Sequence, residues 1–576
     1  MVLVCGIVGY IGTDEAFPLI IQSLEKLEYR GYDSAGVALL GSDIKVVKVV
    51  GGIDKLKNKI LEGRVGIGHT RWATHGGVSE RNAHPHLSCD GEIAVVHNGI
   101  IENWEELKEE LRNHKFVSET DTEVVAHFLE ERLGKGLSME EALKELKSRL
   151  KGTYALVILK KGDDRIYALK KDSPLVLGIL ESGFMLASDI YAFSDKTNKA
   201  IFFEDGEHAI IRRNEYRFFD SENRVVEKRI ENFSWSSGKE EIGNFEHYML
   251  KEIHEEPNAV RRLLLSLRTD QREKLEALKK LMETKRKVMF VASGSSYFAS
   301  LLGVYFLHRA GIESQTLIAS EFHNYERVNG DTLVIPISQS GETMDVLDAV
   351  KLSKRKGAEI VSIVNVPHSS IQRESRFSLE IKAGQEVCVA ATKTFINQVV
   401  LLMELASLFG YRAELDTLPQ EIEHVIKSNE KTIRKLARRL KDKNDIYIIG
   451  RGVTYPVARE IALKLKEIAY IHAEGMMGGE LKHGTLALIE EGVPVISLIP
   501  SKDDEVMSNV IEVESRGAMS IRISPESKEF KIPQTNSGKF AVFSVVLGQL
   551  LAYYIAKERG LPIDKPRNLA KSVTVK

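Results

Sequence analysis

The second half of the chain contains two copies of one pattern. Each copy consists of two units, and each unit is an apolar strand, a loop and a helix. In the first copy this pattern covers residues 287–309 and again 332–357. In the second copy it covers 446–468 and 493–517. Alternation of strands and helices predicts parallel sheets covered by helices, here as two α/β domains of flavodoxin-like type.

The loop after the second strand of the first copy has the composition of an anion-binding site. It reads Ser338-Gln339-Ser340-Gly341-Glu342-Thr343. Free N–H groups at a helix N-terminus attract anions, and hydroxyl groups add donors. Hydroxyl residues are also common helix caps, but three of them within six residues favour a phosphate site. The corresponding loop of the second copy, 501–505, is acidic, and we expect no phosphate there.

The first half opens with a cysteine in an apolar, glycine-punctuated strand, Cys5 within residues 2–12. A thiol is nucleophilic as the thiolate, so a catalytic cysteine needs a nearby base. A free α-amino group, with a pKa near ~7.7–8.0, would be that base if Cys5 were the first residue. Most isolated cysteines are buried small hydrophobic residues, so this stretch alone does not decide the role of Cys5.

Four polar positions downstream strengthen the catalytic interpretation. Expected strands at 65–69 and 93–96 end near Arg71 and near Asn98-Gly99, and Asp121 precedes a helix. Taken singly, these are an ordinary ion pair, a turn and a cap. Together with a thiol they suit an α-amino acid carrying a side-chain amide. Arg71 would bind its carboxylate and Asp121 its ammonium, while Asn98 and Gly99 would stabilise an oxyanion.

The motifs CGIVGYIG, RGYDSAG, GHTRWATHG, HNGIIEN and SETDTE follow one another between Cys5 and about Phe233. This segment resembles the N-terminal-nucleophile glutaminase domain of the class II amidotransferases. The resemblance implies that Cys5 is the nucleophile, that Asn98 and Gly99 form the oxyanion hole, and that Trp72 gates an ammonia passage. The glutamine-binding residues that it implies are Arg71, Trp72, Thr74, His75 and Asp121. It makes His84-Pro85-His86 a structural loop rather than a metal pair.

The chain departs from that family at its start. In the family the cysteine is the first residue after methionine removal, whereas here residues 1–4 precede it. An acylated α-amine is an amide and cannot act as a base. Either a four-residue propeptide is removed, or translation starts at Val4; active enzyme from the native source that retains residues 1–4 by intact mass would reject both.

The motifs VAATK (389–393), LKLKE (463–467), GELKHG (479–484) and the tail DKPRNLAKSVTV (564–575) resemble those of the glutamine–fructose-6-phosphate aminotransferases. The sugar chemistry that this resemblance implies needs a histidine for ring opening, a lysine for an iminium, and a carboxylate that moves a proton between carbons. A single lysine near the C-terminus is ordinarily exposed to solvent. Here the whole tail around Lys571 resembles that of the family, which favours a catalytic role for this lysine.

This resemblance assigns roles in the second half. Lys571 would form the Schiff base, Glu467 would move the proton with Lys464 beside it, and His483 would open the ring from the neighbouring subunit. The sugar-phosphate contacts that it implies are Ser295, Ser296, Ser338, Gln339, Ser340, Thr343, Val389 and Ala570. Ala391 stands where the bacterial pattern has a serine, so one hydroxyl contact with the sugar is lost.

The expected fold is therefore an α+β N-terminal-nucleophile hydrolase domain followed by two α/β flavodoxin-like sugar isomerase (SIS) domains. The expected boundaries are residues 1–233 for the glutaminase, 234–270 for a linker, 271–430 and 431–565 for the two SIS domains, and 566–576 for a catalytic tail. A single amphipathic helix is expected over 260–281, and a helix capped by 118–123.

Composition bounds the function class. The chain has 80 Lys and Arg residues against 82 Asp and Glu residues. Its net charge is therefore too small to attract nucleic acid or an anionic membrane. The three cysteines lack Cys-x-x-Cys spacing, and nothing indicates a metal, nucleotide or pyridoxal cofactor. We expect no apolar run of membrane-spanning length and a cytoplasmic protein.

The sequence thus predicts transfer of ammonia from glutamine to fructose 6-phosphate, giving glucosamine 6-phosphate and glutamate, by at least a homodimer. Two alternatives stay open. One is a sugar-phosphate deaminase or isomerase with an idle first half, if Cys5 stays blocked. The other is a sugar-phosphate sensor, against which the retained Lys571, Glu467 and His483 argue.

Overall fold

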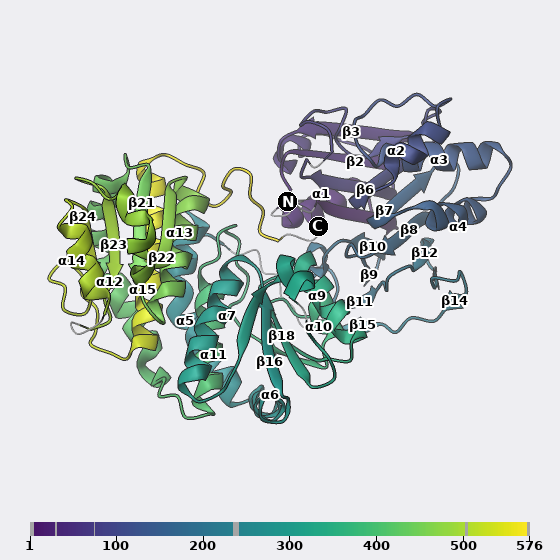
Figure 1. The fold of residues 1–576 in the computed structure, drawn as a ribbon. Helices are drawn as coiled ribbons and strands as arrows, with labels where there is room; N and C mark the ends of the chain where they lie inside the picture. The colour runs from purple at the N-terminus through teal and green to yellow at the C-terminus, as the bar shows by residue number, and fades with distance from the viewer. Residues whose placement is uncertain are drawn as a thin grey trace. The chain divides into compact units, whose positions relative to one another are not determined.

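The computed structural model describes residues 5–28, 31–73, 75–233, 241–325, 327–501 and 505–572 (Figure 1). The chain divides into two compact units between residues 239 and 240. The first is α+β and the second is α/β, so the expected fold class is confirmed.

The first unit contains two antiparallel sheets. The strands of the first sheet, in spatial order, are β15 (Glu231–Asn232), β11 (Lys199–Phe202), β9 (Val176–Leu180), β10 (Gly183–Ala187), β1 (Gly6–Gly12), β4 (Val65–Arg71), β2 (Ser34–Leu40) and β3 (Ile44–Val50). Those of the second are β14 (Val225–Val226), β13 (Tyr216–Phe219), β12 (His208–Ile211), β8 (Ile166–Lys171), β7 (Gly152–Lys160), β6 (Ile93–Ile101) and β5 (His86–Leu87). The helices are α1 (Ala16–Leu27), α2 (Trp104–Glu110), α3 (Glu123–Gly134) and α4 (Met139–Arg149).

The two sheets pack face to face, and helices cover their outer faces. Strand β7 shows why, because its apolar residues alternate between two separate cores. Val157 and Leu159 belong to the core between the sheets, whereas Leu156 and Ile158 belong to the core under α3 and α4. Helix α1 covers the first sheet in the same way. The result is a four-layer α-β-β-α sandwich.

The second unit contains two parallel sheets. Their strands, in spatial order, are β17 (Gln315–Ile318), β16 (Lys287–Ala292), β18 (Thr332–Ser338), β19 (Glu359–Val364) and β20 (Phe377–Glu380), then β22 (His472–Met477), β21 (Asp445–Gly450), β23 (Pro494–Leu498) and β24 (Met519–Ile523). The helices are α5 (Tyr248–Arg268), α6 (Arg272–Thr284), α7 (Gly294–Arg309), α8 (Phe322–Tyr325), α9 (Met344–Arg355), α10 (Ser370–Glu374), α11 (Lys393–Ser407), α12 (Leu418–Leu440), α13 (Thr454–Ala469), α14 (Val506–Glu514) and α15 (Ser537–Glu558).

In each parallel sheet the strand order reverses beside the first strand. The chain leaves β16 for β17 on one side and returns to β18 on the other, and β21 has the same relation to β22 and β23. Loops at the carboxyl ends of strands that flank such a switch point form a crevice where ligands bind. The Ser293–Ser296 and Ser338–Thr343 loops are the two loops at the switch point of the first sheet.

One apolar core joins the two parallel sheets through the helices between them. Figure 1 shows α5, α7 and α11 in this layer. Helix α15 belongs to it and corrects one expectation, because its 22 residues are long and apolar enough to span a membrane. All of its apolar window is buried, so its composition is that of a core helix.

Three local predictions were wrong. Strand β6 continues to Ile101, so Asn98 and Gly99 lie within it and not after it. The expected helix over 260–281 is two helices, because the chain leaves helical geometry at Thr269 (φ −124°, ψ −96°). The helix after Asp121 begins at Glu123, and its cap residue makes no side-chain capping bond.

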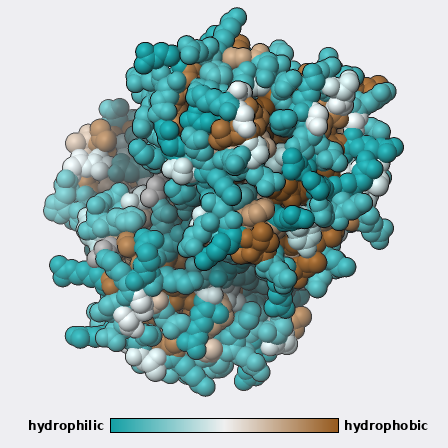
Figure 2. All heavy atoms as spheres, turned by 90° about the vertical axis from the view of Figure 1, so that its right-hand side faces the viewer, coloured by the Kyte–Doolittle hydropathy of each residue, from teal (hydrophilic) through white to brown (hydrophobic). Residues whose placement is uncertain are grey.

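Exposed hydrophobic side chains are scattered over the described surface. On the face in Figure 2 hydrophilic residues predominate, and the hydrophobic ones form small separate groups. Single exposed hydrophobic residues are normal on a folded protein. That face therefore offers no broad apolar patch.

Candidate active sites

Cys5 lies immediately before β1, at the edge of a small cavity in the first unit. Its side chain is buried, with 8% of the residue exposed. The Trp72 N–H donates to its Sγ at 3.2 Å, and the thiol faces the Trp72 carbonyl at 3.6 Å. Burial raises the pKa of the thiol to about 11, against the smaller opposing effects of the Trp72 backbone bond and Arg71. In this state Cys5 is a protonated thiol.

The two oxyanion candidates lie beside Cys5. Asn98 Nδ2 donates to the Cys5 carbonyl at 2.7 Å. Gly99 has φ +130°, and a Cβ there would lie 2.1 Å from the Thr153 carbonyl oxygen. Only glycine fits this position, since a side chain would be both strained and blocked. The backbone of β6 therefore holds residues 98 and 99 next to the thiol.

Arg71 is almost completely buried, and its guanidinium binds the backbone of the loop that follows β4. Its Nη2 donates to the carbonyls of His75 (2.6 Å) and Gly76 (3.1 Å), and Nη1 donates to that of Gly77 (3.2 Å). Asp33 supports the same loop, because its Oδ2 accepts the Ala73 N–H at 3.0 Å. A carboxylate that binds Arg71 here would share the guanidinium with, or displace, these carbonyls.

Asp121 is buried, and its Oδ2 accepts the Ile101 N–H at 2.8 Å. Buried histidines hold the residues around it. His84 and His97 contact the Thr122 hydroxyl, each at 2.9 Å, and His86 contacts that of Thr120 at 3.0 Å. Burial lowers the pKa of all three rings, so they stay neutral near pH 7. These contacts favour the structural interpretation of the His84–His86 loop.

The cavity at Cys5 has a volume of about 20 Å³, close to what one water molecule occupies. Glutamine is larger, so its binding requires lining side chains to move. The residues that line the cavity are Cys5, Arg71, Trp72, His75, His84, His97, Gly99, Thr120, Asp121 and Thr122. Of the predicted glutamine-site residues Thr74 lies outside the described residues, and Asn98 touches Cys5 without lining the cavity.

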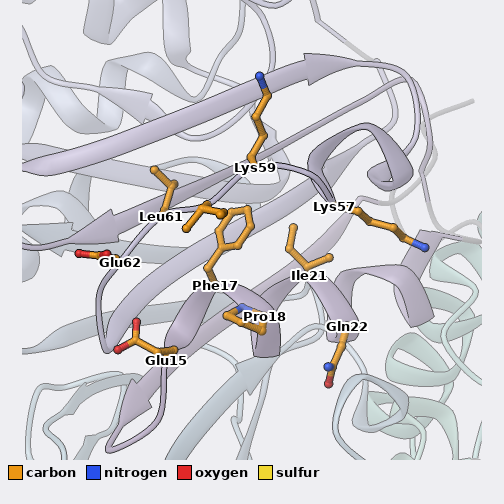
Figure 3. Close-up of a pocket in the computed structure, with 10 residues that line it drawn as sticks. Glu15, Phe17, Pro18, Ile21, Gln22, Lys57, Lys59, Leu61 and Glu62 are labelled. Atoms are coloured by element: carbon orange, nitrogen blue, oxygen red, sulfur yellow. The ribbon is translucent and has the colours of Figure 1, made fainter.

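A larger groove of about 570 Å³ shares no lining residue with this cavity. Figure 3 shows Phe17, Pro18 and Ile21 of α1 facing Leu61, with the charged end of Lys59 extending away from them. Its lining also includes Glu15, Gln22, Lys57, Lys59 and Glu62, but in Figure 3 these side chains do not converge on one point as those of a catalytic site do.

In the second unit, Lys571 forms a buried ion pair with Glu386. The side chains of Lys571 and Glu386 are 4% and 0% exposed. Glu386 also accepts the N–H groups of Thr392 (2.9 Å) and Thr394 (3.0 Å) and the hydroxyl of Thr394 (2.7 Å). Lys571 and these bonds outweigh burial and hold the pKa of Glu386 at about 2. Sequence reasoning missed Glu386, since it belongs to no motif that we used.

Lys464 is the centre of a second buried charge cluster. It donates to Glu467 Oε2 at 2.6 Å and to Ser295 Oγ at 3.3 Å, and it lies 3.4 Å from Glu460. Burial raises the pKa of Glu460 to about 7, although Lys464 opposes the shift. The carboxylates of Glu460 and Glu467 raise the pKa of Lys464 despite its burial, so it remains charged. The predicted Lys464–Glu467 pair thus contacts the first turn of α7 through Ser295.

The predicted phosphate loop has its hydroxyls turned toward its own backbone. Ser338 Oγ accepts the Gly341 N–H at 3.0 Å and lies 3.0 Å from Thr343 Oγ1. Ser340 Oγ accepts the Glu342 N–H at 3.2 Å. Gly341 has φ +66°, which folds the loop back on itself. The loop is therefore closed in the manner of an anion-binding turn before α9.

The remaining sugar-site candidates have four different settings. Ser296 Oγ accepts a bond from Gln398 Nε2 at 3.0 Å. Val389 N–H donates to the Asp564 carbonyl at 3.1 Å, which ties its loop to the tail that carries Ala570. His483 lies in a short 3₁₀ helix, Gly478–His483, and is exposed. The Gln339 carbonyl accepts the Asn365 N–H at 3.2 Å.

Asp564 explains how the tail is held. Its carboxylate accepts the first two N–H groups of α5, those of Tyr248 and Met249, both at 2.9 Å. An acidic group at a helix N-terminus is stabilised by free donors and by the helix dipole. Asp564 is visible in the sequence as an aspartate seven positions before Lys571, but the sequence does not indicate that it binds the start of α5.

Comparisons with known proteins agree with the division of the chain into two units. A family model described as a glutamine amidotransferase domain matches residues 51–234. One described as an SIS domain matches 280–408 and 439–535.

Two curated relatives cover the whole chain. The chain is similar to the isomerizing glutamine–fructose-6-phosphate aminotransferase of Thermococcus kodakarensis, at 45% identity over 99% of this chain and 100% of that protein. It is similar to the protein of the same name from Pyrococcus horikoshii, at 43% identity over the same shares.

Solved structures match the second unit. The C-terminal domain of glucosamine-fructose-6-phosphate aminotransferase from Francisella tularensis has a TM-score of 0.52 and 34% identity, covering 57% of this chain and 99% of that one. A glucosamine-6-phosphate deaminase from Thermotoga maritima has a TM-score of 0.50 and 26% identity, covering 57% and 100%. On the full-length relatives, the chain belongs to the family of isomerizing glutamine–fructose-6-phosphate aminotransferases.

Proposed function

We propose that the chain transfers ammonia from glutamine to fructose 6-phosphate and isomerises the product, giving glucosamine 6-phosphate and glutamate. The buried Lys571–Glu386 pair is the observation that carries this proposal. A C-terminal lysine is seldom buried without a role, and this one lies in a unit of phosphosugar-isomerase fold. A thiol-centred cavity in the other unit supports a glutaminase partner reaction.

The glutaminase reaction begins with the Cys5 thiolate. It attacks the side-chain amide carbon of glutamine, and the oxyanion accepts bonds from Asn98 Nδ2 and the Gly99 N–H. Collapse expels ammonia and leaves a thioester, which water hydrolyses to glutamate. Arg71 binds the α-carboxylate and Asp121 the α-ammonium. His75 borders the same site, and Trp72 controls the exit of ammonia.

The thiolate requires a base that the described residues around Cys5 do not offer. A thiol with a pKa of about 11 is ionised in about one molecule in 10⁴ at pH 7. The neighbouring histidines have lowered pKa values and face threonine hydroxyls. Removal of the residues before Cys5 would free its α-amine, with a pKa near ~7.7–8.0, to take the thiol proton. We infer that the active enzyme begins at Cys5.

The sugar reaction uses the second unit. His483, supplied by a neighbouring subunit of a homodimer, opens the fructose ring, and the Lys571 amine adds to C2 and loses water to form an iminium. Ammonia adds to C2 and expels Lys571. Glu467 then takes a proton from C1 and returns one to C2, which leaves an aldehyde at C1 and an amine at C2. Lys464 keeps Glu467 in place through the 2.6 Å contact.

The phosphate binds at the switch point of the first sheet. Ser338, Gln339, Ser340 and Thr343 surround the N-terminus of α9, and Ser295 with Ser296 begins α7. Val389 and Ala570 border the sugar through the loop and the tail that the Val389–Asp564 bond joins. Exposure of His483 within one chain supports a shared site and hence a homodimer. We propose a cytoplasmic location for the enzyme.

The test is one assay with labelled nitrogen. Purified chain beginning at Cys5 is given fructose 6-phosphate, [amide-¹⁵N]glutamine and excess unlabelled ammonium, and the glucosamine 6-phosphate is analysed by mass spectrometry. Retained ¹⁵N supports the proposal. Loss of the label, or no amino sugar, rejects it.

The second candidate is ammonia-dependent chemistry alone, and the raised thiol pKa favours it for chain that keeps residues 1–4. The same assay on that chain separates the two, because it would form only unlabelled product.

A further inference from the structure

A cluster of metal-ligand side chains lies in the first unit, apart from the Cys5 cavity. It consists of Cys89, His114, His127 and Glu130, and one ligand atom from each lies within 4.8 Å of all the others. The cluster shares no residue with the Cys5 cavity. We propose that these four residues bind a divalent transition-metal ion of the Zn²⁺ class, as a structural site.

The distances within the cluster fit a tetrahedral ion. Cys89 Sγ lies 3.7 Å from His114 Nδ1 and 3.5 Å from His127 Nδ1. Glu130 Oε2 lies 3.0 Å and 3.2 Å from the same two nitrogens. Ligands at Zn–S of about 2.3 Å and Zn–N or Zn–O of about 2.0–2.1 Å are separated by about 3.3–3.6 Å in a tetrahedron. These four distances lie within a few tenths of an ångström of that range.

The outer nitrogens of both histidines are arranged as metal-bound histidines require. His127 Nε2 lies 3.3 Å from Glu123 Oε1, and His114 Nε2 lies 3.6 Å from Glu131 Oε2. A carboxylate thus lies behind each ring, at hydrogen-bond distance from His127 Nε2 and slightly farther from His114 Nε2. Such a carboxylate holds the proton of a metal-bound histidine on Nε2, so that the Nδ1 lone pair is free for the metal. The two rings therefore present the same atom to the same point, each with its own supporting carboxylate.

The ligand types select the metal class. One thiolate, two imidazoles and one carboxylate suit Zn²⁺ or Co²⁺, whereas Mg²⁺ and Ca²⁺ prefer oxygen ligands alone. No sequence motif indicates this site, because His127 and Glu130 share one turn of α3 while Cys89 and His114 come from distant loops. The absence of Cys-x-x-Cys spacing excludes a cysteine-rich site but not this one.

The position of the cluster indicates what the ion would do. Cys89 lies in the turn between β5 and β6, and His114 follows α2, so the ion would link both segments to α3. The Glu123 carboxylate that supports His127 also accepts the N–H groups of Val117 (2.7 Å) and Ser118 (2.6 Å). These residues lead to Asp121. The ion would thereby fix the segment that carries the proposed ammonium-binding aspartate.

The test uses Co²⁺ as the probe on full-length protein stripped with a chelator and kept reduced. We expect about one Co²⁺ per chain, with a thiolate-to-cobalt charge-transfer band that Zn²⁺ abolishes by displacement. The band should be absent from Cys89→Ser and present in Cys5→Ala, the matched control for a thiol outside the cluster. Cobalt binding without the band, no binding, or a band that survives in Cys89→Ser would overturn the proposal.

A second measurement does not depend on a variant. Zn²⁺ should raise the Tm of the wild-type chain by several degrees over the chelated protein, and should leave that of Cys89→Ser unchanged. The KM for glutamine should rise several-fold on stripping, a readout that rests on the proposed role of Asp121. If the metal binds but KM is constant, the site stands and that role is rejected; an unchanged Tm would reject the structural role of the metal.

Discussion

The two candidate centres hold their reactive groups by opposite means. At the glutaminase centre the thiol of Cys5 is kept neutral by burial, and Arg71 is satisfied by three backbone carbonyls. At the sugar centre the lysines form ion pairs with carboxylates: Lys571 with the buried Glu386, and Lys464 with the partly buried Glu467.

This difference predicts how each centre responds to change. At a site built from backbone groups, the position of each group depends on the loop geometry. Replacing a side chain that does not itself react should therefore have little effect on activity. A site built from buried ion pairs fails when one partner is removed, because the other is left as an uncompensated buried charge. Substitutions of the residues around Lys571 should therefore lower activity more often than substitutions of the residues around Cys5.

A second comparison separates the two parallel sheets. Both have the same strand order around a switch point, but their loops differ. The first sheet presents the hydroxyls of the 338–343 loop. At the second, the Arg451 guanidinium forms an ion pair with Glu505 at 2.8 Å, so the positive group that could attract an anion is already neutralised. Topology provides a crevice in both sheets, and side chains decide which one can bind phosphate.

The largest effect should come from Cys5→Ala. Glutamine-dependent formation of glucosamine 6-phosphate should fall by about 10⁵-fold, because no other thiol lies at the cavity and a nucleophile has no substitute. The rate with ammonium chloride in place of glutamine should stay within about twofold. A comparable loss with both nitrogen donors would mean that the two centres are not chemically separate.

Lys571→Ala should lower the rate with both donors by about 10³-fold or more, because the iminium can no longer form. Hydrolysis of glutamine to glutamate should continue, which distinguishes this variant from Cys5→Ala. Trapping with borohydride should give a covalent sugar adduct in the wild type and none in the variant. An adduct that persists in Lys571→Ala would assign the Schiff base to another lysine.

The sequence predicts much of the fold and of both candidate sites. The flavodoxin-like repeat followed from strand and helix periodicity, because parallel strands between helices are almost uniformly apolar. Strand β16 begins at Lys287, where the first predicted strand–loop–helix unit begins. The positions of Cys5, Arg71 and Asp121 around one cavity followed from ordered motifs.

What the sequence could not predict are contacts between distant segments. Glu386 and Lys571 are 185 positions apart, and neither their burial nor their pairing leaves a periodic signal. The break at Thr269 was missed because the residues around it retain a helical apolar pattern. The sequence predicts Gly99 at a strand end, because glycine weakens a strand interior, whereas it lies inside β6 with φ +130°.

Glu386→Gln tests the ion pair directly. Lys571 would keep a hydrogen-bond acceptor but lose its countercharge, so the ion pair that positions its amine would be lost. We expect kcat to fall by about 10–100-fold with a smaller change in KM for fructose 6-phosphate. Glu505→Gln breaks the exposed ion pair of the second sheet and should change the rate by less than about twofold. Equal effects from the two variants would remove the distinction between the sheets.

Ser340→Ala and Thr343→Val test the phosphate loop. Losing a hydrogen bond to a charged group costs about 1.5–3 kcal/mol, so KM for fructose 6-phosphate should rise about 10-fold or more in either variant. Ser501→Ala, in the corresponding loop of the second sheet, should leave KM unchanged. Inorganic phosphate should compete less well against the first two variants. A rise in KM from Ser501→Ala would place the phosphate at the other switch point.

The smallest effect concerns Glu252, a buried carboxyl whose Oε1 accepts the Cys388 N–H at 3.2 Å. Burial raises its pKa to about 8, and Glu386 adds to the shift while Lys571 and Lys393 oppose it. The folded protein then keeps a proton that the unfolded chain loses near pH 4.5, so this group makes stability fall as pH rises from about 4.5 to 8.

Glutamine at position 252 would mimic the protonated form at every pH and could still accept the Cys388 N–H. Glu252→Gln should therefore match the wild-type Tm below about pH 4.5 and exceed it by about 2–4 °C at pH 9. Calorimetry across this range measures the difference, and Glu273→Gln on the exposed side of α6 should show none. A Tm that drops at pH 9 in Glu252→Gln would mean that the ionised carboxylate stabilises the Lys571 cluster, and the sugar centre would then carry one more functional negative charge than its ion pairs indicate.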